Sequence, residues 1–378
     1  MLALHNARVL LDGRLAKGRA VLIEGGRIAG VVAVGEVPAG VERRDLGGAM
    51  LVPGLFDIQV NGGGDALFND DPSVETIRRI GAAHARFGTT GFLPTLISDD
   101  LPVIRAGIAA VDAAIAAGVP GVLGIHVEGP FINPARKGIH AADKIRGIDE
   151  EGFAVLTSLR RGQTLVTLAP EIAGPAAVRR LADAGVVVAA GHTAGTHNEL
   201  TQGIAAGVTG FTHLFNAMSQ LGNREPGAVG AALASEGVWC SLIVDGVHVS
   251  PVTLRLALRC KPSKRFVLVS DAMPTTGGVA RDFWLNGRRI HAEAGRLIAD
   301  DGTLAGADLD MLSAVRNAHA MLGVALPEAF AMASTNAAQF MGLGGELGRI
   351  APGFRASLLA VDDDWTIHAG WIDGVPIA

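Results

Sequence analysis

The sequence has no tyrosine and only two cysteines, Cys240 and Cys260, among its 378 residues. So few cysteines exclude a disulfide scaffold and are typical of a reduced, cytosolic enzyme. No uncharged apolar run reaches the roughly 18 residues that a membrane-spanning helix needs. The first residues lack a basic segment followed by a cleavage site, so no signal peptide is expected. These absences predict a cytoplasmic protein without a membrane partner.

A surplus of basic charge is also missing. The 37 acidic residues outnumber the 32 Lys and Arg residues, for a formal net charge of −5. A chain without a global positive field is not expected to have nucleic acid as its main partner. Hydrophobic residues make up 49% of the chain, which is enough for a large buried core in one or two domains.

The centre of the chain alternates short apolar runs with amphipathic helical stretches, several of which end in glycine. Eight buried strands with helices between them favour a (β/α)8 TIM barrel. An open doubly wound sheet is the alternative, but NGGGDALFND after the first strand does not open directly into a helix as a glycine fingerprint would. The predicted strands are 51–60, 91–95, 122–128, 165–170, 186–192, 210–213, 240–245 and 266–271.

The two ends of the chain differ from the centre, because both consist of short β-rich runs broken by Gly and Asp-Gly turns. Each end is too short for a core of its own. We therefore expect residues 1–49 and 346–378 to form one small β-sandwich domain beside a barrel of residues 50–345. A turn-rich hairpin insertion is predicted at about 273–303, on the catalytic face, where it would serve as a lid.

Polar side chains end several of the predicted strands, where a barrel places its active site. Glu128, His192 and His213 end the third, fifth and sixth strands. One carboxylate and two imidazoles are a recurrent catalytic metal set with one position open for water. A lone core histidine is more often simply hydrogen-bonded, but the joint placement of these three residues predicts a metal site.

Other polar residues near the same face have two interpretations each. Asp271 ends the eighth strand after the apolar run FVLVS, which favours a general base over a cap. His248 either hydrogen-bonds its loop or polarises a substrate carbonyl, and His126 lies deeper, as support for the ligands. Arg224, in the loop LGNREPG, is either solvated surface or an anchor for an anionic group. His5, His84, His197, His291, His319 and His368 are expected at the surface.

The first strand raises a separate question, because Asp57, Gln59 and Asn61 alternate along it and face one way. Gln59 and Asn61 are poor metal ligands and carry no proton usable in catalysis. From the residues alone they are either a metal site without histidines or the polar rim of a pocket.

Seven motifs in order resemble the N-acetylglucosamine-6-phosphate deacetylases of the amidohydrolase superfamily. The motifs are PG-xx-D-x-Q-x-NG, HVEGPFINPARKGIH, GHT, THLFNAM, GNREPG, DGVHV and SDAMPTTG. The resemblance covers almost the whole chain and implies a barrel with a small terminal β domain, often as a homodimer. It implies hydrolysis of the acetamide of N-acetyl-D-glucosamine 6-phosphate, in amino-sugar catabolism or cell-wall recycling.

The resemblance also implies roles for individual residues. Glu128, His192 and His213 would hold the metal, Asp271 would be the catalytic acid and base, and His248 would polarise the acetyl carbonyl. In family dimers, an arginine at the position of Arg224 can reach the neighbouring subunit's site. The implied sugar-phosphate contacts are Ile139, His140, Asn216, Ala217, Arg224, His248 and the backbone of Leu304, Ala305 and Gly306.

Gln59 and Asn61 fall where many amidohydrolases have two histidines that hold a second metal. The family contains members with these histidines and members with Gln and Asn. This sequence has Gln and Asn, so the resemblance implies one divalent metal per subunit here. Zinc is the first expectation, and iron, manganese and cobalt also suit these ligands. Gln59 would hold the nucleophilic water by a hydrogen bond.

Three alternatives stay open at this point. The motifs do not separate epimers at C4, so the substrate is either the glucosamine or the galactosamine compound. Another N-acyl amidohydrolase is a second alternative, although a cyclic-amide hydrolase would need a strand-end lysine and H-x-H. A sugar-phosphate binding protein without catalysis is the third, and the intact Glu128 and Asp271 argue against it.

Overall fold

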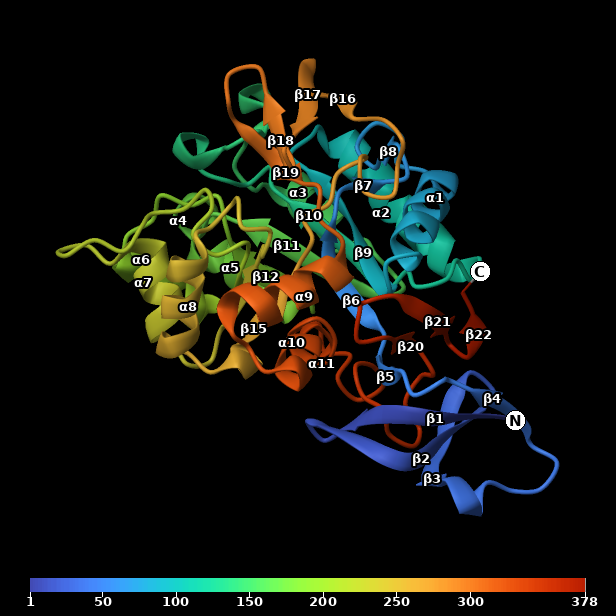
Figure 1. The fold of residues 1–378 in the computed structure, drawn as a ribbon. Helices are drawn as coiled ribbons and strands as arrows, with labels where there is room; N and C mark the ends of the chain where they lie inside the picture. Colours follow the sequence, from blue (N-terminus) through green and yellow to red (C-terminus); the bar gives the residue numbers. More distant parts are fainter. Residues whose placement is uncertain (378) are drawn as a thin grey trace.

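Eight parallel strands follow one another around a barrel in the computed structural model, which describes residues 1–377 (Figure 1). The barrel closes between its first and last strands, because Val60 bridges Ala272 and the Asn61 amide donates to the Ala272 carbonyl at 2.9 Å. The predicted (β/α)8 fold is therefore confirmed. Its strands are β6 (Leu55–Val60), β9 (Thr89–Ile97), β10 (Gly124–Glu128), β11 (Gln163–Leu168), β12 (Val187–Ala190), β13 (Val208–Phe211), β14 (Trp239–Leu242) and β15 (Phe266–Leu268).

Helices cover the outside of the barrel (Figure 1). The first of them starts where the Ser73 hydroxyl accepts a hydrogen bond from the Thr76 amide, and α9 ends at Gly323 in the left-handed conformation. Among the described residues, no helix combines the length and apolar character needed to cross a membrane. The helices are α1 (Val74–Ala85), α2 (Leu101–Ala116), α3 (Glu150–Leu156), α4 (Pro170–Ala173), α5 (Pro175–Asp183), α6 (His197–Ala206), α7 (Gly227–Ala234), α8 (Pro251–Cys260), α9 (Met311–Leu322), α10 (Leu326–Met332) and α11 (Thr335–Phe340).

The stretch 51–60, predicted as one strand, is two strands in two different sheets. Gly54 separates β5 (Met50–Pro53) from β6. A Cβ atom on Gly54 would lie 2.1 Å from the Thr90 hydroxyl oxygen, so only glycine allows this close approach. The chain therefore passes from the small sheet into the barrel at a single glycine.

Both ends of the chain contribute to that small sheet, as expected. Strand β5 lies between them, because it pairs with β1 on one edge and with β20 on the other. The buried side chains of Leu51, Leu358 and Trp371 share one apolar core there. Residue 378 lies outside the described residues. The strands are β1 (Leu2–Leu11), β2 (Arg14–Glu24), β3 (Arg27–Ala33), β4 (Glu42–Asp45), β5, β20 (Leu358–Val361), β21 (Ile367–Ile372) and β22 (Val375–Pro376).

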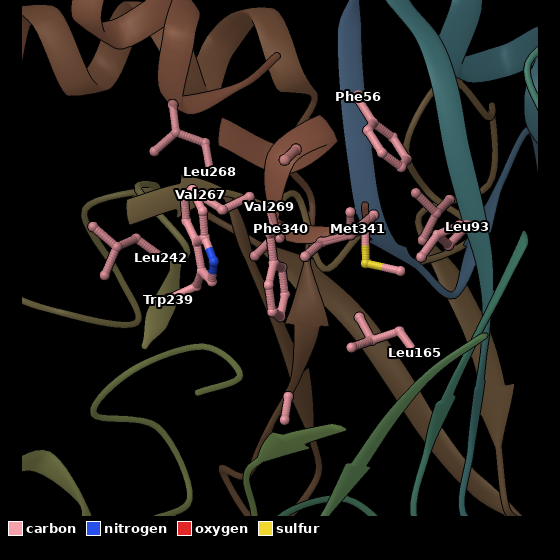
Figure 2. Close-up of a cluster of buried hydrophobic side chains, with 14 of the residues drawn as sticks. Phe56, Leu93, Leu165, Trp239, Leu242, Val267, Leu268, Val269, Phe340 and Met341 are labelled. Carbon is pink, nitrogen blue, oxygen red and sulfur yellow. The ribbon is translucent and has the colours of Figure 1, made fainter. Parts of the chain in front are cut away.

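Apolar side chains fill the amino end of the barrel. Figure 2 shows Phe340 and Met341, from the end of α11, among side chains of several barrel strands. The Phe340 ring lies 5.9 Å from the Trp239 ring, and a Cβ atom on Gly210 would lie 2.4 Å from the Phe340 ring. Because this end is closed by packing, the polar side chains of the interior are left to the carboxyl end.

The turn-rich insertion forms a four-stranded antiparallel sheet rather than a single hairpin. Its last strand returns to the barrel, where the Ala307 amide donates to the Asp271 carbonyl at 2.9 Å. The insertion therefore lies against the carboxyl end of β15. Its strands are β16 (Asp282–Leu285), β17 (Arg288–Glu293), β18 (Arg296–Ala299) and β19 (Leu304–Ala307).

His84 is not a surface residue, contrary to the sequence prediction. Its side chain is fully buried, and its Nε2 atom lies 2.9 Å from the Gly62 carbonyl oxygen. Helical spacing places His84 on the same inner face of α1 as the buried Ile77 and Ile80. The histidine therefore supports the glycine-rich loop that follows β6, which contains the short strands β7 (Gly62–Gly63) and β8 (Ala66–Leu67).

Candidate active site

A cavity of about 500 Å³ opens at the carboxyl ends of the barrel strands, beneath the insertion. Residues predicted from five separate strand ends meet in it. Each polar side chain of this group is largely buried, although the chain segments that carry them are far apart in sequence. They are Glu128, His192, His213, His248 and Asp271.

Three of these side chains converge on one point. The Glu128 Oε1 atom lies 3.2 Å from His192 Nε2 and 2.8 Å from His213 Nε2, and the two Nε2 atoms are 3.2 Å apart. Tetrahedral ligands held at 2.0–2.1 Å from a metal would be separated by about 3.3 Å. The triangle of these three atoms therefore has the size of one face of a tetrahedral metal site.

The hydrogen bonds of His192 leave it ready to act as a ligand. Its Nδ1 atom lies 2.8 Å from the Arg136 carbonyl oxygen, which can only accept, so Nδ1 carries the proton. The Nε2 atom then presents a lone pair toward Glu128 and His213. A backbone carbonyl on the second ring nitrogen is the usual way in which proteins orient a metal-binding histidine.

His140 also approaches this centre, since one ligand atom each from Glu128, His140 and His192 lie within 4.8 Å of one another. Its hydrogen bonds assign it a different role. The Ser98 amide donates to His140 Nδ1 at 3.2 Å, so this nitrogen is unprotonated. Burial and the nearby His192 lower the pKa of His140 to about 3, so the ring is neutral with its proton on Nε2. A protonated Nε2 donates hydrogen bonds and does not bind metal, which favours His213 as the third ligand.

The charges of the three converging groups are strongly linked. Burial opposes the ionisation of Glu128, but the adjacent imidazoles of His192 and His213 hold the pKa of its carboxyl well below the ordinary value. Burial also opposes the charging of His213, yet Glu128 raises the pKa of this imidazole. An ionised carboxylate this deeply buried needs a cation at the centre, and a divalent metal would supply it.

Asp271 faces this group from the opposite side and is held by two amides. Its Oδ1 atom accepts from Gln59 Nε2 at 3.1 Å and from Asn61 Nδ2 at 2.8 Å. Gln59 Nε2 also lies 3.3 Å from both carboxylate oxygens of Glu128. Burial and the charge of Glu128 raise the pKa of Asp271 to about 6. The side-chain amides of Gln59 and Asn61 thus act as hydrogen-bond donors to the carboxylates of the site.

His248 lines the cavity in a fixed orientation. Its Nδ1 atom lies 2.6 Å from the Asp245 carboxylate, which also accepts from the His248 amide at 2.9 Å. Burial opposes ionisation of Asp245, but the hydrogen bond from His248 holds the pKa of this carboxyl below its ordinary value. Because Asp245 occupies Nδ1, the Nε2 atom is the ring nitrogen of His248 that is left to meet a substrate in the cavity.

Three of the site residues have backbone conformations that side chains rarely adopt. The φ angles of His192, His213 and Asp271 are +47°, +34° and +51°. Such strain is concentrated at functional sites, where the surrounding structure holds it in place. Sharp turns directly after β12, β13 and β15 therefore aim these three side chains into the cavity.

A second layer of polar residues lies below the cavity. His126 Nε2 lies 2.8 Å from the Thr167 hydroxyl, and burial lowers the pKa of this histidine to about 4. Asp57 accepts from the hydroxyl and the amide of Ser270, next to Asp271. Burial raises the pKa of Asp57 to about 7. The alternation of Asp57 with Gln59 and Asn61 was the sequence signal for this residue, but it did not reveal the bond to Ser270.

The structure separates the expected substrate contacts into two groups. Ala305 points away from the cavity, because it alternates with its neighbours along β19 and its side chain packs in an apolar cluster of the insertion. Arg224 is exposed and does not line the cavity of its own chain. The expected substrate contacts that do line the cavity, besides His248, are Ile139, His140, Asn216, Ala217, Leu304 and Gly306.

Comparison with known proteins identifies the family of this chain. Residues 50–377 match the amidohydrolase family, and residues 1–51 match the NagA composite domain. N-acetylgalactosamine-6-phosphate deacetylase from Shewanella sp. (strain ANA-3) is 40% identical, over 99% of this chain and 95% of the relative. N-acetylglucosamine-6-phosphate deacetylase from Vibrio furnissii is 34% identical, over 87% and 83% of the two chains.

A solved structure shows the same fold in full. A mutant of N-acetyl-D-glucosamine-6-phosphate deacetylase from Mycobacterium smegmatis, in complex with N-acetyl-D-glucosamine 6-phosphate, aligns with a TM-score of 0.91 and 32% identity. The alignment covers 100% of this chain and 99% of the other. With its barrel, its terminal sheet and its site at the carboxyl ends of the strands, this chain belongs to the amidohydrolase family.

Proposed function

We propose that this chain hydrolyses the acetamide of N-acetyl-D-glucosamine 6-phosphate to acetate and D-glucosamine 6-phosphate. The observation that carries the proposal is the convergence of Glu128, His192 and His213 opposite Asp271 in one cavity. Relatives that cover nearly the whole chain act on amino-sugar phosphates. A sugar phosphate is charged and does not cross a membrane unaided, so the proposed place of action is the cytoplasm.

The three converging residues would hold one divalent metal per subunit. Zinc is the first candidate, because it accepts nitrogen and oxygen ligands in tetrahedral geometry, and iron, manganese and cobalt suit the same donors. A second metal is not proposed, since Gln59 and Asn61 stand where histidines would be needed and both donate to Asp271. When bound, the metal supplies a Lewis acid that polarises the amide carbonyl and lowers the pKa of water.

Asp271 is the proposed general base and then the general acid. Its Oδ1 atom is held by two amide donors, which leaves Oδ2 to take a proton from the attacking water. The water oxygen bonds to the acetyl carbon, and the C–N bond breaks as Asp271 returns the proton to the leaving nitrogen. His248 Nε2 would donate to the carbonyl oxygen, where negative charge develops.

Substrate binding is proposed to use the backbone around Asn216 and Ala217, the side chain of His140 and the start of β19. His140 would donate its Nε2 proton to an oxygen of the sugar, in keeping with its tautomer. Distant contacts of this kind orient the amide at the reacting centre.

A homodimer is part of the proposal. Arg224 lies in an exposed loop before α7 that projects beside α6 (Figure 1). Since Arg224 does not line the cavity of its own chain, we propose that the partner subunit's Arg224 reaches it. Substitution Arg224→Gln and measurement of turnover across an enzyme dilution series would test this contribution, because dissociation and substitution should cause similar losses.

The 4-epimer, N-acetylgalactosamine 6-phosphate, is the second candidate substrate. The observation that favours it is the identity of 40% to a deacetylase of this epimer, against 34% to the Vibrio furnissii enzyme. Both substrates carry the same acetamide and phosphate groups, so the proposed chemistry is unchanged.

Acetate release is the experiment that tests these functions. The two N-acetyl hexosamine 6-phosphates and the unphosphorylated sugars would be compared before and after chelation, with metal resupplied one ion at a time. Fast release that depends on phosphate and metal supports the deacetylase, and the ratio of kcat/KM values identifies the epimer. No release from either phosphate with any of the four metals would reject the proposal and leave binding without catalysis or another N-acyl substrate.

A further inference from the structure

One cationic side chain of the cavity has no part in the mechanism above. Arg136 lines the cavity beside Glu128 and His192, and its side chain is exposed to solvent. Within residues 1–377, its hydrogen bonds are made by the backbone amide and carbonyl. The guanidinium is therefore available to a ligand that enters the cavity.

The backbone that carries Arg136 is held in place by hydrogen bonds to His192 and by the Asn133 cap. The carbonyl accepts from His192 Nδ1 at 2.8 Å. The short turn Pro134–Arg136 is capped by Asn133, whose side chain accepts from the Ala135 amide at 2.9 Å and donates to Glu171 at 3.0 Å. A flexible side chain on a fixed base can reach into the cavity with little reordering of the protein.

The cavity needs a cation if it is to bind a sugar phosphate. A phosphate monoester carries about −1.5 to −2 charges at pH 7, and Glu128 and Asp271 already line the cavity as carboxyl groups. Among the Lys and Arg side chains of the described residues, Arg136 is the one that lines the cavity. The planar guanidinium matches phosphate oxygens with two parallel hydrogen bonds.

We propose that Arg136 binds the phosphate group of the substrate within the same subunit. The inference rests on the proposed deacetylase function and adds a contact that does not depend on a partner. Arg136 is then a substrate-binding residue that separates phosphorylated from unphosphorylated amino sugars.

The test compares Arg136→Gln and Arg136→Lys with the control Lys137→Gln. Lys137 is the adjacent cation of the same segment, and it does not line the cavity. Steady-state kcat and KM would be measured with N-acetylglucosamine 6-phosphate and with N-acetylglucosamine, at several salt concentrations. Each variant keeps the backbone carbonyl that His192 uses, and a thermal melt checks its folding.

Arg136→Gln should raise KM for the phosphorylated sugar by about 10- to 100-fold, as expected for the loss of a charge-assisted hydrogen bond. It should change KM for the unphosphorylated sugar by no more than about twofold. It should also flatten the salt dependence of KM for the phosphorylated sugar. Arg136→Lys should recover part of the loss, and Lys137→Gln should resemble the wild type. Equal losses on both sugars, or equal effects of the two Gln variants, would overturn the assignment. Absence of wild-type turnover with the phosphorylated sugar would instead reject the function on which it rests.

Discussion

The two sides of the cavity use strand-end polar residues for opposite purposes. On the ligand side, made of Glu128, His192 and His213, lone pairs of three side chains converge on one point. On the amide side, made of Gln59, Asn61 and Asp271 with Asp57 beneath them, carboxylate oxygens meet N–H and O–H donors. Converging lone pairs repel one another unless a cation lies between them, whereas N–H donors that point at carboxylate oxygens need no cation. The difference explains why the proposed metal belongs to one side alone.

The largest effect is expected from removing a lone pair on the ligand side. His213→Gln should lose bound metal and, with it, turnover by several orders of magnitude. His140→Gln is the matched comparison, because a ring nitrogen of His140 lies within 4.8 Å of ligand atoms of Glu128 and His192 but its Nε2 carries a proton. This second variant should keep its metal and chiefly raise KM. Metal content by atomic emission, together with kcat and KM, distinguishes the two, and equal metal loss in both variants would make His140 a ligand.

Asp271→Asn should have the next largest effect, because it removes the proposed base without touching the ligand side. Turnover should fall by about 10²- to 10⁴-fold, while metal content stays at the wild-type level. Asp308→Asn is a suitable control, since Asp308 accepts from the Thr275 hydroxyl near the same face but does not line the cavity. Near-normal rates in Asp271→Asn would remove this residue from the mechanism.

Asn61→Ala tests whether the amides tune Asp271. The Asn61 amide stabilises the ionised form of Asp271, so its loss should raise the pKa of this carboxyl further. The base form is the active one, and the acidic limb of the kcat/KM profile should therefore move to higher pH by about 1 unit. Asn198→Ala, on the exposed face of α6, should leave the limb unchanged. An unmoved limb, or one displaced to lower pH, would show that Asn61 does not tune the base.

The sequence was sufficient to predict the barrel and the residues at its strand ends, because barrel geometry turns a strand-end position into a place on one face. Glu128, His213 and Asp271 were found in this way. Arg136 was not found, because its place at the cavity depends on a short turn held by His192 and Asn133. The tautomer of His140 was equally hidden, since it is set by Ser98 at the end of a different strand.

Helical periodicity could have found the buried His84, which repeats the spacing of Ile77 and Ile80 along α1. The break of the first strand at Gly54 could not be predicted, because it depends on contact with Thr90. Contacts between segments far apart in the chain thus account for most of what the sequence left open.

The smallest effect on catalysis, and the clearest one on stability, is expected at Asp57. Burial raises the pKa of Asp57 to about 7 in the folded chain, above its unfolded value of 3.8. Its contribution to stability is therefore fully present below about pH 4 and is lost as the pH rises through 7, by up to about 4 kcal/mol. Asp57→Asn keeps the shape without the charge, so the unfolding free energy of the variant relative to the wild type should increase with pH. Urea unfolding of the metal-free proteins at pH 5 and pH 8 measures this difference.

Asp112→Asn supplies the comparison of opposite sign. Hydrogen bonds from Arg160, and the charges of Arg160 and Arg161, hold the pKa of Asp112 below its ordinary value. Its contribution is present above the unfolded pKa and is lost as the pH falls, so Asp112→Asn should lose stability at neutral pH and recover relative to the wild type in acid. If both variants changed with pH in the same direction, the raised pKa of Asp57 would be wrong. The amide side would then carry an ionised carboxylate beneath Ser270, and Asp271 would have to share its pocket with two negative charges instead of one.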